Sequence, residues 1–189
     1  MNNFPIEHEG KTYWVSRSLA VVCYVYAHVN GKLCVLANKR GPGLPNNVGK
    51  WNCPQGFLDY DETLQEAACR EVWEETGVKL KKRKVRLMEL DSDPNKDNPQ
   101  TVVVRFAYHI SRLRKVRESD LTSENSEPNE VDEIRWIPVK DIENYDWVTE
   151  RHKYRIKQFK YHEKILRTIS GWHYANVMRH NQVHPREGR

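Results

Sequence analysis

Residues 56–78 read GFLDYDETLQEAACREVWEETGV, and this stretch decides the fold. It predicts a helix over residues 62–76. Asp61 is a suitable N-cap, Glu62 is an acid in the first turn, and Gly77 suits the helix end. The apolar stripe of this helix consists of Leu64, Ala67, Ala68 and Val72.

The same helix concentrates negative charge. The helix carries three glutamates on one side, Glu71 and, three and four positions later, Glu74 and Glu75. Like charges at that spacing repel by ~0.2–0.5 kcal/mol per pair. A bound Mg²⁺ or Mn²⁺ would reverse that repulsion, because both ions prefer hard oxygen ligands. Arg70 alone cannot neutralise three carboxylates. An ordinary solvated acidic face also fits the spacing, which leaves both readings open.

Strands are predicted before this helix. Residues 11–17 form a short first strand, and residues 19–29 and 32–39 flank an Asn30-Gly31 pair typical of a tight hairpin turn. Residues 41–50 are rich in glycine, proline and asparagine and therefore predict a loop. A short extended piece at 51–54 leads into a second loop at 56–61.

Strands and helices are mixed after the helix. Residues 84–90, 101–110 and 131–137 predict strands, and the polar stretch 117–130 predicts a mobile loop. Pro138 opens a short helix at 139–144. A last helix over 149–170 carries Ile156, Phe159, Leu166 and Ile169 at helical spacing. We therefore expect an α+β protein, an α/β/α sandwich on a mixed sheet, with one domain over 1–170 and a flexible basic tail over 171–189.

Composition excludes several classes of protein. The chain has 189 residues, 38% hydrophobic and 30% charged, which suits one domain. Since there is no run of 18 apolar residues and no signal-like N-terminus, we expect no membrane span and a cytoplasmic location. None of the four cysteines forms a zinc-ligand pair, and reduced thiols are favoured over disulfides.

Positive charge is concentrated at the C-terminal end. Residues 150–189 hold ten Lys/Arg and three Asp/Glu, a net of +7, whereas the whole chain carries +5. Such a segment can attract RNA or substrate phosphates. It is equally explained as a solvated helix face followed by a tail.

The segment at 56–78 resembles the Nudix box, G-x5-E-x7-R-E-U-x-E-E-x-G-U, where U is an apolar aliphatic residue. The matching positions are Gly56, Glu62, Arg70, Glu71, Val72, Glu74, Glu75, Gly77 and Val78. The resemblance covers roughly residues 12–145. It implies a mixed sheet between helices, with the loop-helix-loop of the box as the catalytic face.

The resemblance also implies a reaction, the hydrolysis of a diphosphate linkage in a nucleoside diphosphate joined to another group. Glu71, Glu74 and Glu75 would hold Mg²⁺, with Mn²⁺ as a substitute, and a backbone carbonyl at Gln55 or Gly56 would complete the protein's ligands. The metal would stabilise charge on the phosphoryl oxygens and acidify the attacking water.

Within the box, Glu74 is the candidate to orient or deprotonate that water. Arg70 would orient the glutamates, and Glu62 would fix the helix start. Pro54-Gln55-Gly56 is similar to the branch containing diadenosine polyphosphate hydrolases and RNA 5′-pyrophosphohydrolases, although Phe57 departs from that branch. ADP-ribose, sugar nucleotides and nucleoside triphosphates are equally open, and RNA is a less favoured partner.

Candidates outside the box are fewer. The resemblance implies an extra metal ligand or base just before Trp136, where Glu130 and Glu133 lie; Glu133 is the favoured candidate, and a solvated acid is the alternative. Lys39 and Arg40 can meet substrate phosphates, or simply end a strand with charge. Trp51 and Tyr24 can stack on a base, although aromatic residues on strands are more often core residues.

A second class of function stays open, the Nudix-fold sensors and regulators that bind nucleotides or nucleotide sugars without cutting them. Such proteins often have an eroded box, whereas this box is complete. Family members often form dimers, so a homodimer is a candidate assembly.

Overall fold

The computed structural model describes residues 4–94, 100–110 and 118–168, with side chains described as far as residue 159. The strands are β1 (Phe4–His8), β2 (Lys11–Val15), β3 (Ser18–Val29), β4 (Lys32–Arg40), β5 (Trp51–Asn52), β6 (Gln55–Phe57), β7 (Arg86–Asp91), β8 (Thr101–Ile110) and β9 (Val131–Pro138). The α-helices are α1 (Leu64–Thr76) and α2 (Glu150–Thr168), and short 3₁₀ turns include η1 (Lys82–Lys84), η3 (Glu118–Asp120) and η4 (Val139–Asn144).

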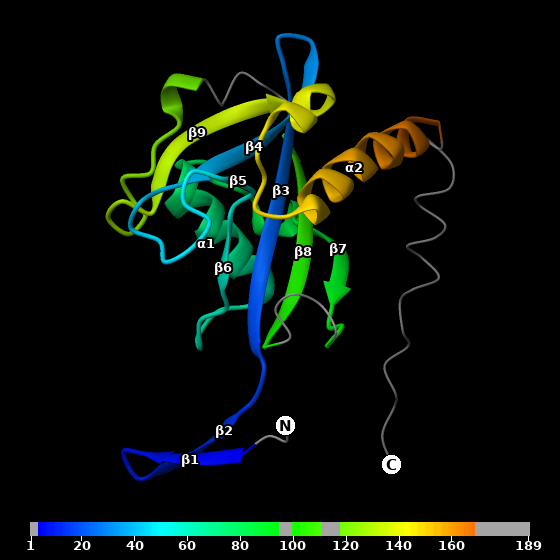
Figure 1. Ribbon diagram of the computed structural model, residues 1–189. Helices are drawn as coiled ribbons and strands as arrows, with labels where there is room; N and C mark the ends of the chain where they lie inside the picture. Colours follow the sequence, from blue (N-terminus) through cyan, green and yellow to red (C-terminus); the bar gives the residue numbers. More distant parts are fainter. Residues whose placement is uncertain (1–3, 95–99, 111–117, 169–189) are drawn as a thin grey trace, which may run out of the picture.

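Seven strands form one mixed sheet, shown in Figure 1. Its main path runs β5-β4-β3-β8-β7, with β9 paired to β4 and β6 paired to β3. The pair β3–β8 is parallel, whereas the other pairs are antiparallel. The expected mixed sheet is therefore confirmed, as is the hairpin around Asn30 and Gly31, both of which have positive φ.

The sheet has a hydrophobic core on each face. On one face Val21, Cys23 and Val25 pack with Ala68 and Val72 of α1. On the other face, a second core joins Val22, Tyr24 and Tyr26 to Ile156 and Phe159 of α2. Because both faces are covered, β3 is buried from Val21 to Ala27, and the molecule is the α/β/α sandwich that the sequence predicts.

The first turn of α1 corrects one prediction. Thr63, rather than Asp61, is the N-cap: its hydroxyl accepts from the Glu66 N–H, and the Glu66 carboxylate accepts from the Thr63 N–H. This reciprocal pair is a capping box. Gly77 ends the helix with φ 74°, as expected, and its N–H donates to the Trp73 carbonyl.

Three further details differ from the sequence prediction. Residues 56 and 57, predicted as the start of a loop, belong to strand β6 instead, since residues 55–57 pair with residues 20–22 of β3. The strand at 11–15 pairs with an unexpected strand, β1, and their hairpin forms a separate sheet extending away from the domain (Figure 1). The helix predicted at 139–144 is a 3₁₀ turn.

Helix α2 is fastened to the sheet by charge as well as by its apolar face. Asp91 of β7 pairs with both Arg105 of β8 and Arg151 of α2, and Glu89 pairs with Arg105 and Arg155. The predicted helix at 149–170 is thus confirmed as far as residue 168, while the tail over 171–189 lies outside the described residues. Within the described part of the chain, neither helix has the length and apolar character needed to cross a membrane.

Candidate active site

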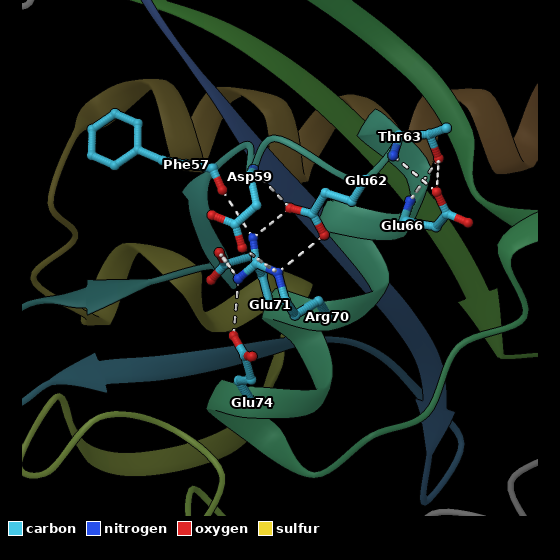
Figure 2. A network of polar contacts seen from close by, with 8 residues as sticks. All are labelled: Phe57, Asp59, Glu62, Thr63, Glu66, Arg70, Glu71 and Glu74. Carbon is cyan, nitrogen blue, oxygen red and sulfur yellow. Dashed lines mark hydrogen bonds and ion pairs between the residues drawn. The ribbon is translucent and has the colours of Figure 1, made fainter. Parts of the chain in front are cut away.

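Arg70 lies at the centre of the acidic side of α1. Its guanidinium donates to Glu62 through Nε (3.1 Å) and Nη2 (2.7 Å), and Nη2 also donates to the Phe57 carbonyl (2.9 Å). Nη1 donates to Glu71 Oε1 (2.7 Å) and Glu74 Oε2 (3.0 Å). Figure 2 shows these acids converging on the arginine from the helix and from the loop before it. Arg70 therefore holds the loop and two glutamates in one arrangement.

Gly56 is required by the position of Glu71. A Cβ built on Gly56 would overlap all three terminal atoms of the Glu71 carboxyl group. Glycine is the residue that lets a backbone approach another group this closely. The box glycine thus brings the β6 backbone against a carboxylate of α1.

Glu75 is the most deeply buried of the three box glutamates. It is 4% exposed, and its Oε2 accepts from the Gln55 backbone N–H at 3.2 Å. Burial raises its pKa well above the ordinary value, and the charges of Glu71 and Glu130 raise it further. Burial likewise raises the pKa of Glu71 to about 7, against the lowering effect of Arg70.

Glu130 is the less favoured of the two acids that the resemblance suggested before Trp136. Its charge acts on Glu71, Glu75 and Arg40. It ends the loop that precedes β9, and its carbonyl accepts from the Gly41 N–H at 2.7 Å. The loop after β4 and the loop before β9 are thus joined beside the carboxylates. The signal for this contact lay only in the pairing of two distant loops.

Arg40 lies within the electrostatic influence of the site glutamates Glu75 and Glu130. Its guanidinium donates from Nε to the Asn46 carbonyl and from Nη2 to Asn46 Oδ1, both at 3.1 Å. Burial lowers its pKa, while the charges of Glu75 and Glu130 act in the opposite direction. Arg40 therefore presents a positioned cation beside the box carboxylates.

Other predicted site residues lie elsewhere. Tyr24 was expected to bind substrate, but it is fully buried under α2, where its hydroxyl bonds with His152 Nδ1 at 3.2 Å. This prediction is corrected, because β3 is buried on both faces. Trp51 is 7% exposed and belongs to the same core, in edge contact with Tyr145.

Glu133 of β9 lies directly opposite Lys39 of β4. The next pair along these strands is Ile134 with Asn38. Since Ala37 and Ile137 of these strands belong to the α2-side core, alternation puts Glu133 and Lys39 on the face opposite the box. Glu133 pairs with Arg135, and Lys39 pairs with Asp132 at 3.0 Å. The structure therefore brings Glu130, not Glu133, to the box glutamates.

With this geometry in view, the match to known proteins decides the family. A profile of the NUDIX domain matches residues 16–159 of the chain. The chain belongs to the Nudix family. Phosphatase NudJ of Escherichia coli strain K12 is 31% identical to this Nudix protein over 124 residues, which are 66% of this chain and 70% of that protein.

Solved structures share the Nudix fold at lower identity. The NUDIX domain of NrtR from Shewanella oneidensis, solved with ADP ribose, has a TM-score of 0.63 and 20% identity, covering 78% of this chain and 88% of that chain. The Ap4A hydrolase of C. elegans has a TM-score of 0.56 and 18% identity, covering 78% and 98%. At these identities the likeness establishes the fold alone.

The donor chemistry of the Nudix site fits a hard divalent cation, since Glu71 and Glu75 are buried oxygen donors with raised pKa values. Among the described residues, however, no three acidic, histidine or cysteine side chains are gathered closely enough to hold an ion. Figure 2 shows Arg70 Nη1 bonded to both Glu71 and Glu74. A metal would compete with Arg70 for those two carboxylates.

Proposed function

We propose that this Nudix protein is a divalent-metal-dependent hydrolase that cleaves a diphosphate linkage in a nucleotide-type substrate. The candidate substrates are ADP-ribose, a sugar nucleotide, a dinucleoside polyphosphate and a nucleoside triphosphate. The observation that carries the proposal is the overlap that any Cβ at Gly56 would make with the buried Glu71 carboxylate. A fold gains nothing from burying like charges against a backbone strand, whereas a metal site needs them there.

The proposed ligands are Glu71, Glu74 and Glu75, with a backbone carbonyl at Gln55 or Gly56. Mg²⁺ is the expected ion and Mn²⁺ the substitute, because the donors are all hard oxygens. When bound, the ion supplies charge neutralisation at the phosphoryl oxygens and acidifies water.

The protein's own groups divide the remaining work. Arg70 fixes the carboxylates and the loop at Phe57, so that they are positioned before substrate binds. Arg40 is the proposed phosphate contact, since it is a half-buried cation in the field of the site glutamates. Glu74, whose side chain is 29% exposed, is proposed to orient or deprotonate water. Glu130 takes the accessory role that the sequence suggested for Glu133.

The relatives support hydrolysis without naming the substrate. NudJ is called a phosphatase, and one structural neighbour is an Ap4A hydrolase. Another neighbour, NrtR, is solved with ADP ribose. Cytoplasmic location, homodimer formation and contact with RNA stay predictions.

A substrate panel tests the proposal. The protein is incubated with each substrate in the presence of Mg²⁺ or EDTA, and the release of nucleotide and phosphate is measured. The panel contains ADP-ribose, sugar nucleotides, diadenosine polyphosphates, NADH, oxidised and normal nucleoside triphosphates and 5′-triphosphorylated RNA. Turnover of one member that EDTA abolishes is expected. Binding without turnover of any member would contradict the proposal and support the sensor reading.

A further inference from the structure

Two buried asparagines lie side by side, and among the described residues their side-chain oxygens have no hydrogen-bond partners. Asn38 of β4 and Asn52 of β5 are directly opposed in the β4–β5 pair and are 2% and 1% exposed. Neither Oδ1 atom has a partner within the part of the chain that the structure describes. Buried polar atoms are nearly always hydrogen-bonded, so this pair is unusual: the described residues supply no donor, and a ligand can supply one.

Both side chains lie on the α1 face of the sheet. Leu36 packs in the α1-side core and Ala37 in the α2-side core, so alternation along β4 returns Asn38 to the α1 face. Residues that are directly opposed in an antiparallel pair share a face, which places Asn52 there as well. The pair therefore shares its face with α1, the box helix.

The pair also adjoins the catalytic groups along the chain. Arg40 is two residues beyond Asn38 on β4, and its interaction with Glu75 and Glu130 places it at the carboxylates. Gln55 is three residues beyond Asn52, and its N–H donates to Glu75. A substrate whose phosphates lie at Arg40 and the glutamates would thus have its remainder within reach of the asparagines.

The chemistry of the pair selects a donor group. Two carboxamide oxygens repel phosphate oxygens and accept from N–H or O–H groups. The Trp136 ring N–H, opposite Leu36 on the same face, is buried and has no partner among the described residues. Two acceptors and one donor complement the edge of a base that carries an amino group, because adenine and guanine each present at least two N–H bonds beside a ring or carbonyl acceptor.

We propose that Asn38 and Asn52 bind the donor edge of an amino-bearing nucleobase and thereby set the base preference of this hydrolase. The inference rests on the proposed function for its biological meaning, whereas its test measures binding and needs no hydrolysis. Uracil and hypoxanthine each present a single ring N–H at that edge and satisfy only one of the two oxygens.

Binding of mononucleotides in EDTA tests the inference without any turnover. Isothermal titration calorimetry would compare AMP, GMP, IMP, UMP and ribose 5-phosphate on the wild type, Asn38→Leu and Asn52→Leu. Tyr26→Phe is the matched control, because it removes another buried side-chain oxygen without a partner among the described residues, on the α2 side. We expect AMP or GMP to bind at least tenfold more tightly than IMP, UMP and ribose 5-phosphate. Each asparagine variant should lose that preference, and Tyr26→Phe should keep it.

Equal affinity of the wild type for all five ligands, or no measurable binding of any, would overturn the inference. So would an unchanged preference in folded Asn38→Leu and Asn52→Leu proteins, which would leave the oxygens as sites for buried water. If a variant fails to fold, the wild-type ratio of AMP to IMP decides alone, since these ligands differ only at the amino edge. Failure of the proposed function has a different signature, base-selective binding with no turnover on the substrate panel.

Discussion

Replacing Gly56 by alanine is the sharpest single test of the site geometry. The new Cβ would lie well inside the 3.0 Å that real Cβ contacts respect, against the Glu71 carboxyl group. The carboxylate must therefore retreat by roughly 1 Å, and misplacement of a catalytic group by that distance costs about 10²-fold in rate. We expect kcat/KM to fall by about that factor with Mg²⁺ present.

The assay is steady-state hydrolysis of whichever panel substrate the wild type cleaves, together with urea unfolding. Gly31→Ala is the control, because its Cβ would meet no atom within 4 Å while its φ of 76° makes the substitution strained. That variant should lose about 1 kcal/mol of stability and keep its activity. A folded Gly56→Ala protein with activity within threefold of the wild type would refute the reasoning.

Three further outcomes are expected. Thr63→Ala removes the capping box and should cost about 1 kcal/mol in urea unfolding while leaving KM unchanged; equal stability would contradict the cap assignment. Burial raises the pKa of Glu71 to about 7 from 4.5, so its stabilising effect is full below pH 4.5 and is lost as pH rises through 7. Metal-free protein should lose on the order of 3 kcal/mol of unfolding free energy from this group as pH approaches 8, with a smaller slope in Glu71→Gln; a pH-independent stability would count against this. Tyr24→Phe should lose about 1 kcal/mol with the His152 contact and keep its KM, whereas a tenfold higher KM would restore the tyrosine as a substrate contact.

The helix and most strands could be predicted because their signals are local. Gly77 ends α1 as the sequence indicates, and the Asn30-Gly31 turn fixes the first hairpin. The error at the helix start was also local: Thr63 and Glu66 have the spacing of a capping box, and that signature outweighs a lone Asp61.

Errors at the site came from long-range packing. A strand that is buried on both faces has no polar alternation, so the sequence could not tell that Tyr24 faces α2. The choice of Glu133 over Glu130 depended on how β9 pairs with β4, where a register shift between Lys39 and Arg40 changes the pairing at the end of the strand. Only the fold supplies that register.

A comparison of Glu75→Gln with Glu124→Gln shows whether the buried carboxylates hold a divalent ion for hydrolysis. Both changes remove one negative charge, from a glutamate that is 4% exposed in the site and from an exposed loop residue respectively. We expect at least a 10²-fold loss of Mg²⁺-dependent turnover in folded Glu75→Gln and none in Glu124→Gln. Wild-type turnover in folded Glu75→Gln would contradict this.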